Sequence, residues 1–315
     1  MCSLTSPKSE RALIIVNPKA KNGQAGKQWT RLEKLIREEY HREYQAEFTT
    51  APMHAMSLAR QGLRDGYDLV VAVGGDGLIN EVVNGFLEGE KALNPQAVLG
   101  ILPFATAGDF VKTVGIPGDF REAVKRLRSS STRPCDLGSI KCESLDGRSL
   151  LRYFINIAEF GVGAEVVERV NRTTKRFGGS ASFTWGILRT MPFYRNKTVF
   201  YTIDNSPEDQ AKVNNMVVAN GRFYGAGLQP APEAQIDDGL FDIAVIRDIG
   251  FIGVAKNLGK LRDGTYLELP QVHFQRGKSV SAKCSERVLI EADGEVVGRL
   301  PATFKILPAA IKIRA

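Results

Sequence analysis

The stretch Val70-Val71-Ala72-Val73-Gly74-Gly75-Asp76-Gly77-Leu78-Ile79-Asn80-Glu81 decides the fold of this 315-residue chain. It runs from an apolar segment typical of a buried strand, through three glycines around Asp76, directly into a helical pattern. Glycines let backbone N–H groups approach phosphate oxygens, and a helix N-terminus adds positive potential. The stretch therefore predicts a phosphate-binding turn, in which Asp76 would hold or orient a magnesium ion. For this stretch alone, a plain strand–turn–helix with an aspartate cap stays open as an alternative.

The residues on either side of this stretch repeat the alternation of strand and helix. Apolar runs at 12–16 and 98–102 predict two more strands, and a turn with proline follows each. The helical spacing of apolar residues predicts three helices, over 26–40, 54–63 and 78–88. Strands that are apolar on both faces and alternate with helices are typical of a parallel sheet covered on both sides. We therefore expect a doubly wound, nucleotide-binding α/β domain over residues 1–136.

Short strands and turn residues dominate the rest of the chain. The candidate strands are 152–158, 198–203, 213–219, 240–246, 278–283, 287–292 and 303–307. Their turn-rich spacing predicts an antiparallel β-sandwich, interrupted by one helix near 251–262. We therefore expect a second, all-β domain over residues 137–315, and its final residues could return to the first domain.

The composition is that of an ordinary globular protein. Hydrophobic residues make up 43% of the chain and charged residues 24%, which excludes a disordered or fibrous protein. The longest apolar runs are much shorter than a membrane span, and the first eight residues lack the apolar core of a signal peptide. We therefore expect a cytoplasmic protein. The net charge of +7 comes without a recognisable nucleic-acid motif, so no nucleic-acid partner is expected.

Cysteine chemistry is not a feature of this sequence. The four cysteines are Cys2, Cys135, Cys142 and Cys284, and none belongs to a closely spaced pair. Structural zinc sites need such pairs, so we expect free thiols in a reducing compartment.

Three loops should meet at one edge of the expected parallel sheet. In a doubly wound sheet the carboxyl ends of the strands face a common crevice. That rule brings together the loops 17–23, 74–80 and 103–109, which offer small residues, hydroxyls, lysines and two aspartates. This combination predicts a nucleoside triphosphate site. The open alternatives are a solvated turn for the lysines, and a helix cap before Phe110 for Thr106 and Asp109.

The stretch from Arg169 to Lys197 contains seven basic residues and no acidic residue, together with several aromatic side chains. Basic residues interleaved with aromatic residues favour contact with an anionic membrane surface. A helix that packs its apolar side on the second domain and leaves its basic side in water is an equally good interpretation.

Seven motifs occur in order along the chain. They are Asn17-Pro18; Gly74-Gly75-Asp76-Gly77; Pro103…Thr106…Asp109-Phe110 with Gly115-Ile116-Pro117; Asn156…Gly161-Val162-Gly163; Ala219-Asn220-Gly221…Tyr224-Gly225-Ala226-Gly227; Pro232 to Asp242; and Asp293-Gly294-Glu295. Together they resemble the diacylglycerol-kinase-like lipid kinases, in the bacterial branch that is also similar to sphingosine and ceramide kinases. The resemblance covers nearly the whole chain. It implies a nucleotide-binding α/β domain, a β-sandwich domain, and an active site between them that transfers the γ-phosphate of ATP to a lipid alcohol such as diacylglycerol.

The resemblance also implies roles for individual residues. Asp76 would act through Mg²⁺, and Glu295 would be the general base that takes the proton from the lipid hydroxyl. The Asp238 side chain, with the backbone carbonyls of Gln235 and Leu240, would bind a structural magnesium ion. From their aromatic content and lack of acidic residues, we also expect residues 177–194 to form the wall or membrane-facing lip of the apolar cleft that lipid tails need. The residues that would contact ATP are Asn17, Pro18, Lys19, Ala20, Lys21, Thr49, Gly74, Gly75, Asp76, Gly77, Leu78, Ile79, Asn80 and Thr106.

From the residues alone, Asp293-Gly294-Glu295 and Asp237-Asp238-Gly239 indicate turns before strands as readily as a base or a metal site. Three positions also depart from the family pattern: Leu78 replaces a threonine, Gly108 an asparagine and Lys21 a glycine. Each lost polar group would weaken ATP binding by about 1–2 kcal/mol, the value of a hydrogen bond to a charged group. The added charge of Lys21 would offset part of that loss.

Two other functions stay open at this point. A soluble kinase of the NAD kinase type shares the GGDG turn, and a catalytically weak lipid- or nucleotide-binding module is compatible with Leu78 and Gly108. The expected lipid substrate implies peripheral contact with a membrane. The sequence names neither the acceptor lipid nor the oligomeric state, which leaves a homodimer open.

Overall fold

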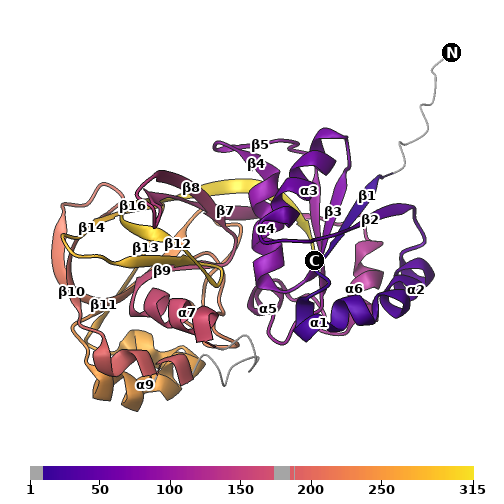
Figure 1. The fold of residues 1–315 in the computed structure, drawn as a ribbon. Coiled ribbons are helices and arrows are strands. Elements are labelled where there is room, and N and C mark those ends of the chain that lie inside the picture. Colours follow the sequence, from indigo (N-terminus) through magenta and orange to yellow (C-terminus); the bar gives the residue numbers. More distant parts are fainter. Residues whose placement is uncertain (1–9, 174–184, 188) are drawn as a thin grey trace.

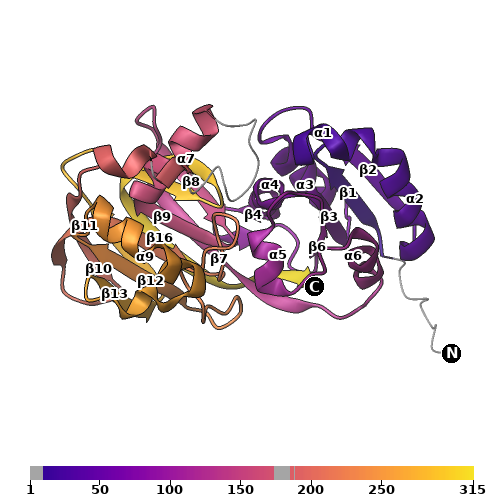
Figure 2. The same cartoon turned by 90° about the horizontal axis from the view of Figure 1, so that it is seen from below.

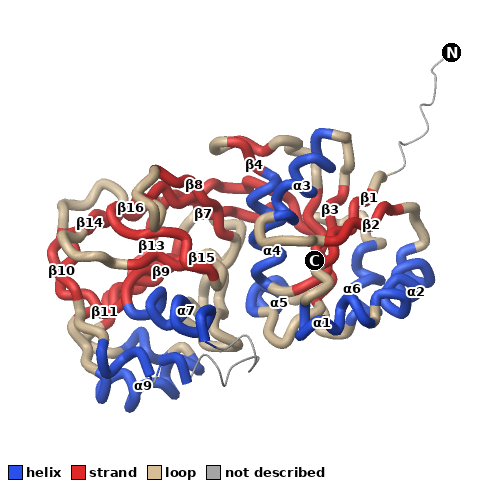
Figure 3. Tube along the Cα trace, in the orientation of Figure 1, coloured by secondary structure: helices blue, strands red, loops and turns tan. Residues whose placement is uncertain are grey.

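The structure is a computed structural model that describes residues 10–173, 185–187 and 189–315. Figure 1 shows two lobes side by side, an N-terminal lobe in indigo and violet and a C-terminal lobe mostly in magenta, orange and yellow. Helices surround the sheet of the N-terminal lobe, whereas strands dominate the C-terminal lobe (Figure 3). An α/β unit is therefore followed by a β-rich unit, as the sequence pattern predicts.

The sheet of the N-terminal lobe is parallel, with its strands in the order β16-β6-β3-β1-β2. They are β1 (Ala12–Val16), β2 (Tyr44–Phe48), β3 (Leu69–Gly74), β6 (Val98–Pro103) and the end of β16 (Glu295–Arg314). Every residue of β1 and β3 is buried, because helices cover both faces of this sheet.

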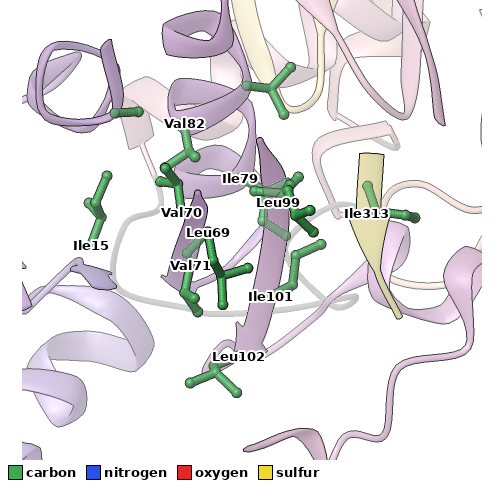
Figure 4. Packing of buried hydrophobic residues seen from close by; sticks show 14 of the residues in the cluster. Ile15, Leu69, Val70, Val71, Ile79, Val82, Leu99, Ile101, Leu102 and Ile313 are labelled. Atoms are coloured by element: carbon green, nitrogen blue, oxygen red, sulfur yellow. The ribbon is translucent and has the colours of Figure 1, made fainter. Parts of the chain in front are cut away.

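Two pairs of helices cover the two faces. The first pair is α3 (His54–Arg64) and α4 (Asp76–Phe86), and the second is α2 (Trp29–Tyr40) and α6 (Phe120–Leu127). Gly62 of α3 lies against Leu13 of β1, whereas Gly100 of β6 lies against Leu127 of α6. The strand register places Leu13 and Gly100 on opposite faces of the sheet. Figure 4 shows the core between the strands and α4.

The loop after β1 differs from its prediction. The expected single helix over 26–40 is two helices, α1 (Ala20–Lys27) and α2. Lys21, Asn22 and Gly23 have positive φ angles of 51°, 56° and 80°, so α1 contains a left-handed turn. Hydrophobic spacing cannot anticipate this conformation, which is unusual for lysine. The remaining elements of this lobe are α5 (Asp109–Val114) and a hairpin of β4 (Leu87–Glu88) and β5 (Lys91–Ala92).

The C-terminal lobe is built from antiparallel strands. They are β7 (Arg133–Glu143), β8 (Ser149–Phe154), β9 (Ile157–Gly161), β10 (Lys197–Ile203), β11 (Asp209–Ala219), β12 (Phe241–Arg247), β13 (Val272–Gly277), β14 (Ser279–Lys283), β15 (Leu289–Ala292) and most of β16. Six of them, β11-β9-β15-β16-β14-β10, pair in a closed circuit, because β10 pairs again with β11. The predicted strand 152–158 is two strands, β8 and β9, separated by a short turn.

Aromatic rings fill the interior of this lobe. The ring centroids of Phe154 and Phe241 lie 5.6 Å apart, and those of Phe160 and Phe304 lie 6.0 Å apart, in stacked arrangements. All four side chains are fully buried. Stacking adds to the large apolar area that each ring removes from water, so these pairs hold the strands in fixed positions.

Helices cover one side of the C-terminal lobe (Figures 1 and 2). They are α7 (Val162–Thr173), α9 (Phe251–Asp263) and the short 3₁₀ helices η1 (Met191–Phe193) and η2 (Thr265–Glu268). The predicted helix near 251–262 is thus confirmed as α9. Between these helices and strands β11–β13 lies a pocket with mostly apolar walls, to which Val166, Met191, Leu258 and Tyr266 contribute. We refer to it as the apolar pocket.

Strand β16 belongs to both lobes. It pairs with β7, β14 and β15 in the C-terminal lobe, and its residues 312–314 pair in parallel with residues 98–100 of β6. The buried Arg314 side chain forms an ion pair with Glu10, close to the start of β1. The last residues of the chain therefore complete the sheet of the N-terminal lobe.

Two predictions from composition concern the whole chain. Cys135, Cys142 and Cys284 are free thiols, as expected, and Cys2 lies outside the described residues. Every helix within the described ranges is too short or too polar to cross a membrane.

Candidate active site

The three loops at the carboxyl ends of β1, β3 and β6 meet, as the sheet order predicts. The Asn17 N–H donates to the carbonyl of Val73 at 3.2 Å, and the Phe104 N–H donates to the carbonyl of Gly74 at 3.0 Å. A Cβ atom on Gly75 would lie only 2.9 Å from the Cβ of Ala105, so this position requires glycine. The loops 17–23, 74–80 and 103–109 are therefore in direct contact.

The first loop projects a cation toward the third. The Asn17 side chain accepts a hydrogen bond from the Lys19 N–H at 2.9 Å, which fixes the start of the turn. Lys21 begins the left-handed turn, and its ammonium lies 5.5 Å from the centre of the Phe104 ring. Thr49 is joined to the same edge, because its N–H donates to the carbonyl of Val16 at 2.9 Å. Lys21 thus places a positive charge where the resemblance expects phosphates.

The N-terminus of α4 has the form of an anion site. The first N–H groups of a helix have no partner within it, and a Cβ on Gly77 would meet no atom within 4 Å. Leu78 and Ile79, in contrast, have buried side chains, and their N–H groups donate to the carbonyl of Gly75. These two residues support the turn from inside and do not offer side chains to a nucleotide.

Asp76 links the second loop to the third. Its carboxylate accepts hydrogen bonds from the N–H groups of Asp109 at 3.0 Å and Phe110 at 3.2 Å, at the start of α5. Burial, and the nearby charge of Asp109, raise the pKa of Asp76, whereas these hydrogen bonds lower it. Each carboxylate oxygen can accept a further contact, so Asp76 fits a magnesium ion that is otherwise held by phosphate oxygens. The predicted cap of α5 by Thr106 or Asp109 is wrong, because Asp76 supplies it.

Asp109 joins the two lobes. Its buried carboxylate pairs with the Lys112 ammonium at 2.9 Å and accepts a hydrogen bond from the Ala226 N–H at 2.7 Å. Ala226 lies within three consecutive residues of positive φ, residues 225–227. The glycines of the Tyr224-Gly225-Ala226-Gly227 motif therefore permit a tight loop that brings a backbone donor to the nucleotide-binding lobe.

Asn80 makes a second junction between the lobes, which the sequence does not predict. Its side-chain amide donates to the carboxylate of Asp293 at 2.8 Å and to the carbonyl of Tyr153 at 3.0 Å. Asn84, one helical turn later, exchanges hydrogen bonds with the backbone of Tyr153. The side-chain amide of Asn80 thus bonds to residues of the C-terminal lobe. In the sequence, only the four-residue spacing that places Asn80 and Asn84 on one face of α4 could have indicated this junction.

Asp293 accepts four hydrogen bonds in the interior. Besides the Asn80 amide, the donors are the N–H groups of Ile155, Asn156 and Ile157, at 2.9 to 3.0 Å. Burial raises the pKa of Asp293 to about 6, although each of these hydrogen bonds lowers it. Asp293 therefore fastens the turn between β15 and β16 to α4 of the other lobe.

Glu295 lies directly after this turn. Asp293 and Gly294 both have positive φ, 49° and 92°, as a two-residue hairpin turn between antiparallel strands requires. The turn interpretation is therefore confirmed, and it leaves the Glu295 side chain exposed beside the lobe junction. Asn171 of α7 donates to the Gly294 carbonyl at 3.2 Å and lies 3.4 Å from a carboxylate oxygen of Glu295.

A guanidinium group of the protein itself lies at the predicted structural magnesium site. The Asp238 carboxylate accepts a hydrogen bond from the Leu240 N–H at 3.0 Å and forms an ion pair with Arg276. The Arg276 guanidinium already balances the charge of Asp238, so Asp238, Gln235 and Leu240 are a poor set of ligands for magnesium in this structure.

The described part of the basic aromatic stretch carries both pocket-lining and exposed apolar side chains. Ile187 and Met191 line the apolar pocket, whereas Trp185 and Phe193 are exposed, with 56% and 80% of their surface accessible. The Arg189 guanidinium lies 5.8 Å from the centre of the Trp185 ring. Residues 174–184 and 188, which include Phe177 and Phe183, lie outside the described residues.

Two family models match adjacent parts of the chain. Residues 11–140 match the diacylglycerol kinase catalytic domain, and residues 156–315 match the YegS C-terminal NAD kinase beta sandwich-like domain. A diacylglycerol kinase of Bacillus subtilis (strain 168) is 27% identical over 94% of this chain and 93% of its own length. A protein of Chromohalobacter salexigens named "Probable lipid kinase YegS-like" is 30% identical over 82% of this chain and 79% of its own length.

Solved structures show the same fold. A diacylglycerol kinase from Bacillus anthracis str. Sterne matches with a TM-score of 0.71 and 21% identity, over 98% of both chains. An NAD kinase from Archaeoglobus fulgidus in complex with ATP matches with a TM-score of 0.51 and 13% identity, over 97% of this chain and 93% of its own. The fold alone does not separate the two kinds of kinase, but the sequence relatives do. The chain belongs to the family of diacylglycerol kinases and YegS-like lipid kinases, and it is a lipid kinase.

Proposed function

We propose that the protein transfers the γ-phosphate of ATP, with Mg²⁺, to the hydroxyl group of a lipid alcohol such as diacylglycerol. The observation that carries this proposal is the hydrogen bond between Asn80 and Asp293. It joins the helix that begins at the Gly-rich turn to the turn that presents Glu295. Groups suited to phosphate and a candidate base thus lie at one junction, as in-line phosphoryl transfer needs.

The nucleotide would lie against the three loops of the N-terminal lobe. The turn at 74–77 leads into a helix whose first N–H groups have no partner within that helix, and the first loop offers the Lys21 ammonium. Thr49 and Thr106 lie at the same edge. Asp76 would hold the magnesium ion, which supplies charge neutralisation at the phosphates when it is bound. Asp76 is already oriented by α5, so it needs little rearrangement to do so.

Glu295 would accept the proton of the lipid hydroxyl. Its backbone is fixed, because Asp293 and Gly294 form a tight turn that is bonded to both lobes. Its side chain is exposed, which leaves it accessible to a substrate. A base held in place in this way commonly accelerates such a reaction by about 10²–10⁴-fold.

The apolar pocket, with a free volume of about 80 Å³, would receive the end of one lipid tail. The first turns of α7, at Val162, Gly163 and Val166, line the pocket, and Asn171 near the end of the same helix contacts the Glu295 turn. One helix therefore connects the apolar pocket with the proposed base. A lipid with the end of one tail in the pocket would extend its head group along α7 toward the phosphates.

The outer surface around this pocket suits a lipid bilayer. Trp185 and Phe193 are exposed on one side of it, and Phe251 and Ile252 are exposed at the start of α9. The Asn196 side chain bonds to the loop before α9, which brings the two segments together. Lys256 and Lys260 of α9 add positive charge. Such surfaces favour peripheral contact with anionic membranes.

A labelling assay tests the proposed reaction. The protein is incubated with γ-labelled ATP, Mg²⁺ and either a total lipid extract or NAD. We expect label in a lipid, dependent on Mg²⁺, and none in NADP. Label in NADP alone would support an NAD kinase-type enzyme, and nucleotide binding without any labelled product would support a binding module.

A flotation assay tests the membrane contact separately. Replacing both Trp185 and Phe193 with serine should reduce binding to vesicles rich in phosphatidylglycerol several-fold. Leu145→Ser, which changes an exposed residue in the β7–β8 turn, is the matched control. Equal binding of all three proteins would remove the membrane contact from the proposal.

A further inference from the structure

Four aspartates gather where the two lobes join, at the base of β12. Asp237 and Asp238 lie in the turn before this strand, and Asp242 lies within it. Asp136 lies on β7, and its N–H donates to the carbonyl of Ile236 at 2.6 Å. Burial raises the pKa of Asp136, and the charges of Asp238 and Asp237 add to that rise, whereas hydrogen bonds from the backbone of Ala309 and Gly239 lower it. We refer to the four as the acidic turn. Such a group of like charges needs a cation close by.

Arg276 of β13 supplies that cation. Its Nε atom donates to the buried carboxylate of Asp242 at 2.7 Å, and its terminal NH2 group donates to the carboxylate of Asp238. The position of Arg276 is fixed by the sheet, because β12 and β13 pair Asp242 directly with Arg276. The planar guanidinium therefore bridges the strand and the turn that precedes it.

The acidic turn in turn holds the strand that crosses between the lobes. The carboxylate of Asp136 accepts hydrogen bonds from the N–H of Gly239 at 2.7 Å and from the N–H of Ala309 at 2.6 Å. Ala309 has a positive φ of 47° and lies in β16, just before its residues enter the sheet of the N-terminal lobe. Arg276 is thus connected to the lobe junction, because it bonds to Asp238, whose neighbour Gly239 bonds to Asp136.

We propose that Arg276 takes the structural role that the family resemblance gives to a magnesium ion, so that the acidic turn of this chain is held without metal. A guanidinium keeps its charge over the whole physiological pH range and makes directed bonds to two carboxylates. A magnesium ion at Asp238 would have to share the carboxylate with Arg276, which already bonds to both Asp238 and Asp242. This proposal does not depend on the proposed phosphoryl transfer.

Thermal unfolding without nucleotide tests the proposal. The melting temperature of the wild-type protein should be the same in EDTA and in excess MgCl₂. Arg276→Met should lower it by several degrees. Arg247→Met is the matched control, since Arg247 also lies on a strand and bridges two groups, the Asp209 carboxylate and the Tyr201 hydroxyl, away from the acidic turn. The control should cause a smaller loss, because Asp209 is exposed and tolerates the loss of its partner.

Further variants identify where any metal acts. A wild-type melting temperature that rises with MgCl₂, still rises in Asp76→Asn and no longer rises in Asp238→Asn would overturn the proposal. A rise that disappears in Asp76→Asn would place the metal at the nucleotide loops and leave the acidic turn metal-free. Arg276→Met with wild-type stability would also overturn the proposal. The wild-type comparison stands even if Arg276→Met fails to fold.

Discussion

Glu159 of β9 and Glu291 of β15 lie directly opposite each other, and both carboxyl groups are buried. Burial raises the pKa of Glu159 to about 7, although a hydrogen bond from the Asn215 amide lowers it. Burial, followed by the charge of Glu159, raises the pKa of Glu291 well above its ordinary value. The pair therefore retains a proton near neutral pH.

The first prediction concerns the stability that the folded protein loses at high pH because the carboxyl group of Glu159 is buried. The folded pKa of Glu159 lies above its ordinary value of 4.5, so the folded protein binds more protons between pH 4.5 and about 7. Its contribution to stability therefore falls as the pH rises through that window. Glu159→Gln should be more stable than wild type near pH 8 by about 1–3 kcal/mol, with little gain near pH 5.

Urea unfolding at a series of pH values measures this effect. Glu88→Gln, at an exposed glutamate, is the control and should follow the wild type at every pH. A gain for Glu159→Gln that is the same at all pH values would contradict the assignment.

The second prediction concerns Asp293, whose carboxylate accepts four hydrogen bonds. In Asp293→Asn an amide group replaces one acceptor oxygen and faces N–H donors. We expect a loss of about 2–4 kcal/mol of stability and faster proteolysis at the lobe junction. Asp146→Asn, in the exposed β7–β8 turn, should change neither measurement. Wild-type resistance to protease in Asp293→Asn would show that the turn is held by other contacts.

At the scale of elements, the crossing of α3 and α4 depends on a close approach. A Cβ on Gly85 of α4 would lie 2.6 Å from the backbone carbonyl oxygen of Met56 and 2.7 Å from the Cβ of Ala59. The Gly-rich turn begins α4, so the position of that turn depends on this packing. Gly85→Ala should therefore cost about 1–3 kcal/mol, even though alanine favours helices more than glycine does.

Chemical denaturation of Gly85→Ala and Gly259→Ala, both within helices, separates packing from helix propensity. A Cβ on Gly259 of α9 would meet no atom within 4 Å, so that variant should be at least as stable as wild type. If Gly85→Ala is as stable as Gly259→Ala, α3 and α4 have room to separate and the packing argument fails.

Elements with a strong local signal could be predicted from the sequence. Strand 70–73, its glycine turn and the helix after it follow from neighbouring residues, and the sheet order then brings the three loops together. The left-handed turn at Lys21 could not be predicted, because it opposes the local preference of lysine. The role of Asn80 could not be predicted either, because its partner Asp293 is 213 residues away. The replacement of a metal by Arg276 likewise needed the β12–β13 register.

At the scale of the whole molecule, strand β16 ties the two lobes into one unit. Ile313 near its end is fully buried in the core of the N-terminal lobe, although it follows the C-terminal lobe in sequence. Ile313→Ala should cost about 2–4 kcal/mol. Because β16, Asp109 and Asp293 all join the lobes, we expect the protein to unfold in a single thermal transition. Ile313→Ala should shift this whole transition to a lower temperature.

Calorimetry checks this prediction, with Ile252→Ala as the control. Ile252 has 68% of its surface exposed, so its truncation should leave the transition temperature unchanged. Two separate transitions, of which Ile313→Ala moves only one, would show that the lobes unfold independently.

Phosphoryl transfer at the lobe junction is tested most directly by the single-turnover rate of Glu295→Gln. Wild type and variant are saturated with labelled ATP and Mg²⁺ and mixed with diacylglycerol in micelles, and nucleotide affinity is measured separately. We expect the rate of lipid labelling to fall by about 10²–10⁴-fold while ATP affinity stays unchanged. A variant that labels the lipid within a few-fold of the wild-type rate would show that another group accepts the proton, and Asp76 would then be the residue to test.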